Sequence, residues 1–369
     1  MRKLITSFVF FTTAILCFNA CTKKQDSPTG IIISDTTAPS IQWAKCFGGE
    51  NYDYADMIQQ TSDNGYIIGG MTRSLGGDIT GKHANSDFWI VKLDENGKLL
   101  WQKTLGGSGD DYCNSIQQTS DGGYIVGGET ESNDGDVTSN NGGYDFWVVK
   151  LNAVGKIVWQ KTFGGSQYDN ANSIQQTSDG GYIVAGETES FNGDVVGNHG
   201  SSDYWIVKLD ANGSMMWQKT LGGRGFDAAN SIKQTFDGGY IVTGFTLSSG
   251  GDVTNYRGGN DFWVVRLDAK GNIVWQKTLG GSFEDDAYSI SQTSDGGYIV
   301  AGRTLSNNGD VIGNHGDYDS WVVKLDGNGT LIWQKTLGGT EEEEASSVQQ
   351  TLDGGYIVAG VTNSSNNGD

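Results

Sequence analysis

Six tryptophans recur along this chain of 369 residues at a fixed interval of 58 residues. They are Trp43, Trp101, Trp159, Trp217, Trp275 and Trp333. A fixed period of this length predicts one structural unit copied about six times and packed as a closed ring or a stacked array. Most of the sequence therefore encodes a repeated framework, and residues that recur in every copy belong to that framework.

The copy that begins at Ala171 shows what one repeat builds. Short β-forming runs at 172–177 and 182–186 flank Ser-Asp-Gly-Gly, and runs at 203–209 and 215–221 flank a turn ending in Asn-Gly. Glycines at these places supply the positive φ of tight hairpin turns. No segment of helix length carries a helical period, so we expect an all-β protein with four antiparallel strands per repeat, which is a propeller blade.

The aromatic residues fall into repeated columns. All eleven tryptophans occupy two repeat positions, one on the fourth strand and one on the third. The third-strand column is Trp89, Trp147, Trp205, Trp263 and Trp321, and a tyrosine column is Tyr66, Tyr124, Tyr182, Tyr240, Tyr298 and Tyr356. We predict that these rings pack between blades, each contributing roughly 2–3 kcal/mol by burial. A sugar-stacking platform is the alternative, but a ligand rarely contacts every blade alike.

The repeat boundaries predict five complete blades and one divided blade. The complete copies cover about 55–105, 113–163, 171–221, 229–279 and 287–337. Residues 345–362 supply only first and second strands, whereas 31–35 and 41–43 resemble third and fourth strands. We expect a six-bladed β-propeller of four-stranded antiparallel blades, with the sixth blade closed by N- and C-terminal hairpins. An open solenoid is the alternative, and it would leave uncapped strand edges.

The N-terminus has the layout of an export signal. Arg2 and Lys3 precede an apolar run over 4–18, which is short for a membrane span. Ala20-Cys21 resembles the lipobox of bacterial lipoproteins, and this resemblance implies cleavage before Cys21 and lipidation of its thiol. An ordinary signal peptide with an incidental cysteine is the alternative. We expect a signal peptide over 1–20, a lipidated cysteine and polar tether over 21–29, and a propeller over 30–369.

Charge and cysteine content narrow the classes of partner. The formal charge of −20 becomes −22 once residues 1–20, with Arg2 and Lys3, are removed. Without a basic stripe to neutralise phosphates, nucleic acid is not an expected partner, and we expect a monomer that meets the membrane only through its lipid.

Cys46 and Cys113 are predicted to be small buried residues, and without a CxxC pair no zinc site is expected.

The whole repeat resembles a known group of proteins. Its pattern, GGxxxDxAxSIQQTSDGGYIVAGxTxS…DxWVVKLDxxGxxxWQKT, covers roughly residues 30–369 and is similar to the propeller-repeat lipoproteins secreted by Bacteroidetes. Its layout also resembles kelch-type propellers with short blades. The resemblance implies a palmitate-bearing protein of the cell envelope, anchored at the outer membrane. Names such as endoglucanase or bulb-type lectin occur in this group, but the lectin pattern QxDxNxVxY is not matched at 176–182.

The copies disagree beside a threonine that recurs after the second strand. The flanking pairs are Met71/Arg73, Glu129/Glu131, Glu187/Glu189, Phe245/Leu247, Arg303/Leu305 and Val361/Asn363. Blades two and three are acidic there, whereas blades four and five are apolar and basic. Because variable positions on a rigid scaffold commonly carry recognition, the first five pairs are our candidate ligand-binding residues. Drift at solvent-exposed positions is the alternative.

The glutamate pairs raise the question of catalysis. Residues i and i+2 on a strand lie about 7 Å apart on one face, within the range that glycosidases use. Nothing in the sequence marks either carboxyl as an acid with a raised pKa, so we assign no catalytic residue. We expect binding of a glycan or protein ligand. A polysaccharide hydrolase or lyase using the acidic patch, and a purely structural envelope or adhesion module, are the alternatives.

Carboxylates in Gly/Asn-rich loops also suggest calcium, which prefers oxygen ligands. The best candidates are Asp134 and Asp136, in the run Asn-Asp-Gly-Asp. No copy matches an EF-hand loop, and the even spacing of the aspartates in every blade favours capping of backbone N–H groups. The three histidines, His83, His199 and His315, alternate around the ring too far apart to share a metal. No cofactor other than calcium is therefore considered.

Overall fold

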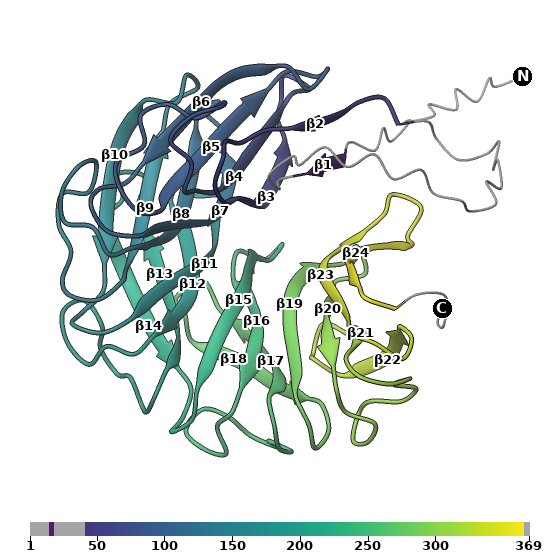
Figure 1. Cartoon of the computed structure of the whole chain (residues 1–369). Coiled ribbons are helices and arrows are strands. Elements are labelled where there is room, and N and C mark those ends of the chain that lie inside the picture. Colours follow the sequence, from purple (N-terminus) through teal and green to yellow (C-terminus); the bar gives the residue numbers. More distant parts are fainter. Residues whose placement is uncertain (1–14, 18–40, 365–369) are drawn as a thin grey trace, which may run out of the picture.

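The computed structural model describes residues 15–17 and 41–364, which form strands, turns and loops. The sheets follow one another around an arc, with the first strand of each on the inside and the last on the outside (Figure 1). Within the described ranges, no helix has the length and apolar character needed to cross a membrane. The chain is an all-β protein, as its turn and strand pattern predicts.

Five four-stranded antiparallel sheets occur among the described residues, each made of consecutive strands, and each is one blade. Blade 1 comprises β3 (Asp53–Gln60), β4 (Tyr66–Thr72), β5 (Asp87–Leu93) and β6 (Leu99–Leu105). Blade 2 comprises β7 (Asp111–Gln118), β8 (Tyr124–Thr130), β9 (Asp145–Leu151) and β10 (Ile157–Phe163). Blade 3 comprises β11 (Asp169–Gln176), β12 (Tyr182–Thr188), β13 (Asp203–Leu209) and β14 (Met215–Leu221).

The remaining blades repeat this order. Blade 4 comprises β15 (Asp227–Gln234), β16 (Tyr240–Thr246), β17 (Asp261–Leu267) and β18 (Ile273–Leu279). Blade 5 comprises β19 (Asp285–Gln292), β20 (Tyr298–Thr304), β21 (Asp319–Leu325) and β22 (Leu331–Leu337). A hairpin of β23 (Glu343–Gln350) and β24 (Tyr356–Thr362) follows. The prediction of five complete blades is confirmed, and the architecture is a β-propeller.

The turns form where the sequence places them. In blade 3, the Asp179 carboxylate accepts hydrogen bonds from the Thr177 hydroxyl at 2.5 Å and the Gly181 amide at 3.0 Å. Gly180 between them has a φ of 83°, which a side chain would disfavour. The ammonium of the buried Lys208, on β13, lies 2.9 Å from the same carboxylate. One ion pair therefore ties the first hairpin of the blade to its third strand.

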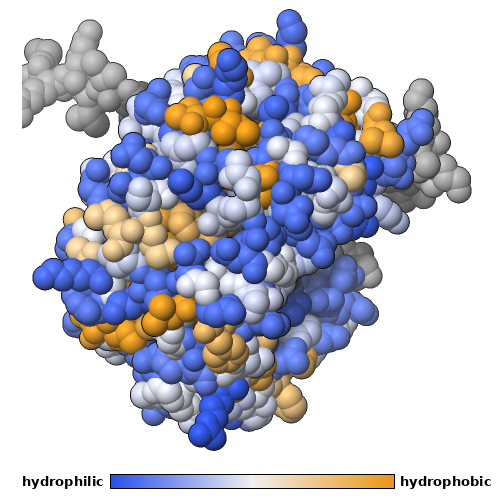
Figure 2. Space-filling view, turned by 90° about the vertical axis from the view of Figure 1, so that its left-hand side faces the viewer, coloured by the Kyte–Doolittle hydropathy of each residue, from blue (hydrophilic) through white to orange (hydrophobic). Residues whose placement is uncertain are grey.

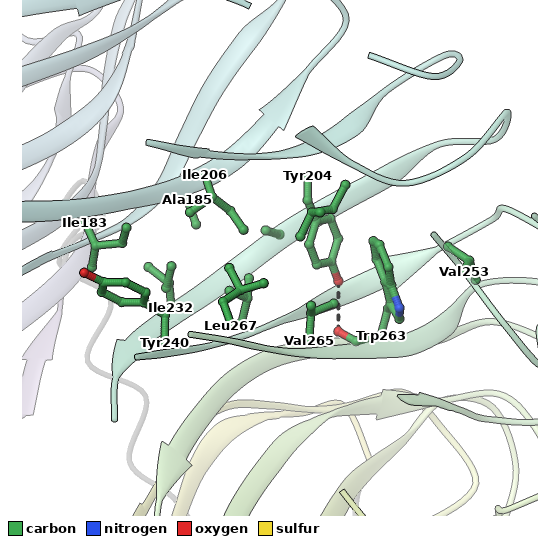
Figure 3. Packing of buried hydrophobic residues seen from close by; sticks show 13 residues of the cluster. Ile183, Ala185, Tyr204, Ile206, Ile232, Tyr240, Val253, Trp263, Val265 and Leu267 are labelled. Carbon is green, nitrogen blue, oxygen red and sulfur yellow. Dashed lines mark hydrogen bonds between the residues drawn. The ribbon is translucent and has the colours of Figure 1, made fainter. Parts of the chain in front are cut away.

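Aromatic rings fill the space between blades, as predicted. Figure 3 shows blade 3 facing blade 4, where the Tyr204 hydroxyl points toward Trp263 and donates a hydrogen bond to its carbonyl oxygen at 3.0 Å. Their ring centroids are 4.6 Å apart, and both side chains are fully buried. The fourth-strand tryptophans lie nearer the surface. Trp159, for example, meets Tyr182 of the next blade edge-on at 5.6 Å.

The outermost strands present a different surface. Each carries an exposed aliphatic residue at its second position, and Figure 2 shows apolar areas separated by hydrophilic ones on the side it presents. These residues are Leu100, Val158, Met216, Val274 and Ile332. One lies on the outermost strand of each complete blade, and Ile273 and Trp333 beside them are also exposed.

The N-terminal strands differ from the prediction. The expected fourth strand at 41–43 begins later, as β2 (Ala44–Cys46), and it pairs in parallel with β1 (Ile15–Cys17), inside the predicted signal peptide. The expected third strand at 31–35, the lipidation candidate Cys21 and the tether lie outside the described residues. Cys113 is buried as predicted, but the prediction was wrong for Cys46, which is exposed because β2 lies outside the blades.

Candidate ligand site at the inner end of blades one to three

Residues shared by the copies form small hydrogen-bonded clusters that join neighbouring strands and loops. We call such a cluster, centred on one buried aspartate, a latch. In blade 3, the Asp169 carboxylate accepts hydrogen bonds from the hydroxyl groups of Thr188 and Ser190 and from the Gly165 amide. These partners come from the end of the second strand, the following loop and the glycine pair before the first strand. The recurring threonine is therefore a framework residue, and the aspartate column caps backbone and hydroxyl donors as the even spacing predicts.

The third-strand aspartates form a second latch. Asp203 accepts hydrogen bonds from the backbone amide of His199 at 2.9 Å and lies 2.6 Å from its Nδ1. His83 and His315 contact Asp87 and Asp319 in the same way. Each histidine therefore contacts the third-strand aspartate of its own blade, and His83 Nε2 also lies 3.9 Å from Asp136 Oδ2 in the loop of blade 2.

The calcium candidates also contact the backbone. Asp134 Oδ1 accepts a hydrogen bond from the Ser108 amide at 2.7 Å, and Asp136 Oδ2 accepts one from the Gly106 amide at 3.4 Å. In the described part of the chain, no group of three or more His, Cys, Asp or Glu residues is arranged to hold a metal ion. Binding of calcium by these two residues stays a prediction.

The variable positions divide into a more buried set and a more exposed set. The first member of each pair is the last residue but one of the second strand, and the second member follows the threonine that ends the strand. Met71, Glu129 and Glu187 are buried and Phe245 and Arg303 half-buried, whereas Arg73, Glu131 and Leu247 are exposed and Glu189 and Leu305 intermediate. Neighbours two apart therefore have different environments, and the Glu187 carboxyl is affected both by Glu189 two residues on and by Glu129 in the preceding blade.

A cavity of about 320 Å³ opens at the inner end of blades 1 to 3. It is lined by Tyr54, Asp56, Met71, Tyr112, Asn114, Glu129, Asn170 and Asn172. These residues come from the starts of the three inner strands and the ends of β4 and β8, where the interstrand loops also meet. The structure thus brings two of the candidate residues, Met71 and Glu129, into one pocket.

Glu129 and Glu187 are the unusual acids of this region. Burial raises the pKa of Glu129 to about 7, and a hydrogen bond from the Tyr168 hydroxyl offsets part of that rise. Burial also raises the pKa of Glu187 to about 7, and the negative charges of Glu129 and Glu189 add to it. Within the described residues, Glu129 Oε2 is buried without a hydrogen-bond partner. An ionised carboxylate without a partner is costly to bury, so the carboxyl is stabilised either by keeping its proton or by contact with a cation.

Tyrosines surround Glu129. The rings of Tyr112 and Tyr144 lie 6.2 Å apart, and Tyr144 meets Tyr168 edge-on at 5.6 Å. Arg73 donates from Nη2 to the Tyr112 hydroxyl at 3.3 Å and from Nε to Ser86 at 2.9 Å. Sequence reasoning missed these tyrosines, although their repeat positions also vary between copies: Tyr112 is replaced by Asn170 in blade 3.

The opposite blades carry different chemistry at the same positions. In blade 4, Phe245 stacks on Phe226 with centroids 5.8 Å apart. In blade 5, Arg303 is held by the Asp286 carboxylate at 3.0 Å and lies over the Tyr318 ring at 4.3 Å. The same repeat position is therefore acidic in blades 2 and 3, apolar in blade 4 and occupied in blade 5 by an arginine that carboxylates surround.

Comparisons with known proteins give distant likenesses. No family model matches the chain. Regulatory protein FlaEY of Caulobacter vibrioides is 24% identical over 302 residues, a region that covers 73% of this chain but only 31% of the relative's length. A Bacteroides caccae protein of unknown function is similar in structure with a TM-score of 0.43 and 13% identity, covering 76% of this chain and 81% of that one. The Neurospora crassa Pan2 WD40 domain has a TM-score of 0.44 and 13% identity, covering 82% and 85%.

Proposed function

We propose that this chain is an exported, lipid-anchored β-propeller that binds a glycan or protein partner at the inner cavity of blades 1 to 3. One observation carries the proposal: the shared residues form latches and interblade packing, whereas the cavity is built where the copies differ and is lined by Glu129, whose Oε2 has no hydrogen-bond partner among the described residues. A polar cavity with tyrosines at its wall suits a ligand that offers both hydrogen bonds and flat faces.

A binding screen of residues 30–369 tests this function. The propeller would be applied to arrays of polysaccharides, glycans and surface proteins, with and without EDTA. Binding without product release is the expected result, and Glu129→Gln should weaken it. Loss of binding in EDTA would support calcium at Asp134 and Asp136. A ligand retained at full strength by Glu129→Gln would exclude this cavity as the site.

A polysaccharide hydrolase is the second candidate, and the pKa values near 7 of Glu129 and Glu187 favour it. A carboxyl that keeps its proton near neutral pH can act as a general acid. Incubation with polysaccharides, followed by reducing-end analysis, checks for turnover. An unchanged hydrolysis rate in a variant with glutamine at both positions would contradict catalysis at this site.

The lipid anchor is a proposal of its own. Metabolic labelling with a palmitate analogue, followed by fractionation of the envelope, should label the wild-type protein and leave Cys21→Ser unlabelled. Labelling of the serine variant would show that Cys21 is not the acceptor.

We also propose that the propeller closes as six blades. Trp43 meets Tyr66 of blade 1 edge-on at 5.6 Å, the same contact that Trp333 makes with Tyr356 at the other end. Trp43 thus has the packing of a fourth-strand tryptophan that precedes blade 1. The side chain of Ile357 on β24 is 60% exposed, whereas Ile299 at the equivalent position of blade 5 is fully buried. A third strand from residues 31–35 would complete this sheet.

A further inference from the structure

Arg303, near the C-terminal end of β20 in blade 5, shows how this propeller accommodates a charge at this repeat position. Its guanidinium donates from Nε to Asp286 at 3.0 Å and from Nη1 to Glu342 at 3.3 Å, and Glu344 lies 3.7 Å away. The guanidinium carbon lies 4.3 Å from the centroid of the Tyr318 ring. Asp286 and Tyr318 of blade 5, together with Glu342 and Glu344 at the C-terminal hairpin, therefore surround this planar cation.

Glu129 occupies the same repeat position in blade 2, with the charge reversed. Tyr144 stands where blade 5 has Tyr318, and Tyr168 stands where it has Glu342. Within the described residues, no ion pair involves Glu129 or Glu187, and no cation lowers the pKa of either. The one arginine near this wall, Arg73, binds Ser86 and Tyr112. Blade 2 thus supplies carboxyls and tyrosines but no cation.

We infer that the Glu129 cavity binds the guanidinium group of an arginine side chain from a protein partner. Glu129 Oε2, on a side chain with 8% exposure, supplies the unpartnered acceptor, and the cavity of about 320 Å³ has room for the end of such a side chain. Tyr54 and Tyr112 line the cavity and offer ring faces on which a guanidinium stacks. This inference rests on the proposed binding function and names the chemistry of its ligand.

The surrounding charges favour a cation. The acidic groups facing this wall are Asp56, Asp110, Glu131, Glu187 and Glu189, against the single positive charge of Arg73. Removing a guanidinium and its carboxylate from water together is far less costly than burying the carboxylate alone. Binding should also draw the proton from Glu129, because a cation at contact distance favours the ionised form.

Titration calorimetry with ethylguanidinium tests the inference. The wild-type propeller should bind it with a dissociation constant on the order of 1 mM, as expected for so small a ligand, and should not bind the neutral analogue N-ethylurea. Glu129→Gln should weaken binding at least tenfold. Glu95→Gln, which removes one exposed charge in a hairpin turn of blade 1, should bind like the wild type. Equal binding of N-ethylurea, or an unchanged affinity in Glu129→Gln, would overturn the inference.

Proton release gives a second readout that does not depend on a variant. At pH 7, the heat of binding should vary with the ionisation enthalpy of the buffer, because protons leave as ethylguanidinium binds. A heat independent of the buffer would contradict ionisation of Glu129 on binding. If the array screen finds a ligand but ethylguanidinium does not bind, the arginine inference fails while the scaffold function stands. If neither binds, both fail.

Discussion

Gly244 lies on β16 at the point where the second strand of blade 4 passes closest to the first. The register between β15 and β16 shifts between Ala229 and Ser231, so the first strand bulges beside this glycine. A Cβ at Gly244 would lie 1.9 Å from the carbonyl oxygen of Ala228, which is rigid backbone. The repeated glycine at this position is therefore required by contact between two strands rather than by an unusual φ.

We expect Gly244→Ala to lower the free energy of unfolding by about 3 kcal/mol or more, the upper part of the range for overpacking, because backbone must move to admit the methyl group. Gly250→Ala is the matched control in the same blade, since its Cβ would meet nothing within 4 Å. It should change stability by less than about 0.5 kcal/mol. Urea denaturation of both variants checks this, and equal midpoints would contradict the close approach.

The latch on the first strand of each blade ties that strand to the second strand, to the loop after it and to the glycine pair before it. Thr188 on β12 is fully buried and donates to Asp169 on β11, whose carboxylate also accepts from Ser190 and Gly165. Thr188→Val keeps the shape of the side chain but leaves one oxygen of a buried carboxylate without its donor. We expect a loss of about 1–3 kcal/mol in the free energy of unfolding.

The control for the latch is Ser201→Ala, an exposed hydroxyl in the same blade. Its free energy of unfolding should stay within about 0.5 kcal/mol of the wild type. Thermal and urea unfolding of the two variants separate a structural latch from a surface hydroxyl. A loss for Thr188→Val no greater than that for Ser201→Ala would show that the latch contributes little.

The sequence could predict these elements because the same pairing is repeated in every copy. The turns at Gly180 and Gly213 and the strands around Trp205 follow from residue types that suit only one conformation. Strand β2 was misplaced because its partner β1 comes from outside the repeat. Sequence analysis missed Tyr112 and Tyr168 because they approach Glu129 only when neighbouring blades pack together. The pattern within one repeat contains no information about contacts between repeats.

At the scale of the whole molecule, buried carboxyls set the response to pH. Burial raises the pKa of Asp145 and of Asp261 to about 7. Their Oδ1 atoms, like those of the other third-strand aspartates, have no hydrogen-bond partner within the described residues. In the exposed hairpin turns, by contrast, hydrogen bonds lower the pKa of aspartates. The hydrogen bond from Thr61 lowers the pKa of Asp63 to about 2, and the hydrogen bond from Thr293 lowers the pKa of Asp295 to about 2.

From the carboxyls with raised pKa values and those with lowered pKa values together, we predict that the protein is most stable in mildly acidic solution. The raised carboxyls stay protonated when folded but ionise near pH 4 when unfolded, so their stabilisation is complete below about pH 4 and is lost as the pH rises to 7. The lowered carboxyls stabilise above pH 4 and lose that contribution as the pH falls toward 2. Urea midpoints measured from pH 3 to 9 should peak between about 4 and 6. A steady rise toward pH 8 would contradict these shifts.

The proposed closure as six blades depends on the two ends of the chain completing one blade. In blade 3, β12 pairs with β11 on one edge and with β13 on the other, so both sets of its amides are bonded. β24 pairs with β23 alone among the described residues, and its outer face is largely exposed. A third strand from residues 31–35 would pair with the other edge of β24, and the face of the completed sheet would then pack against blade 1.

Hydrogen exchange of the β24 amides in the mature, lipid-free chain tests this closure most directly. The six-bladed account predicts that all of the amides over 356–362 are protected to a similar degree as those of β12, and that deleting residues 22–40 exposes the alternate amides that face the outer edge. If those alternate amides exchange at unprotected rates in the intact chain, the ends do not pair and the propeller is open between blade 1 and the C-terminal hairpin.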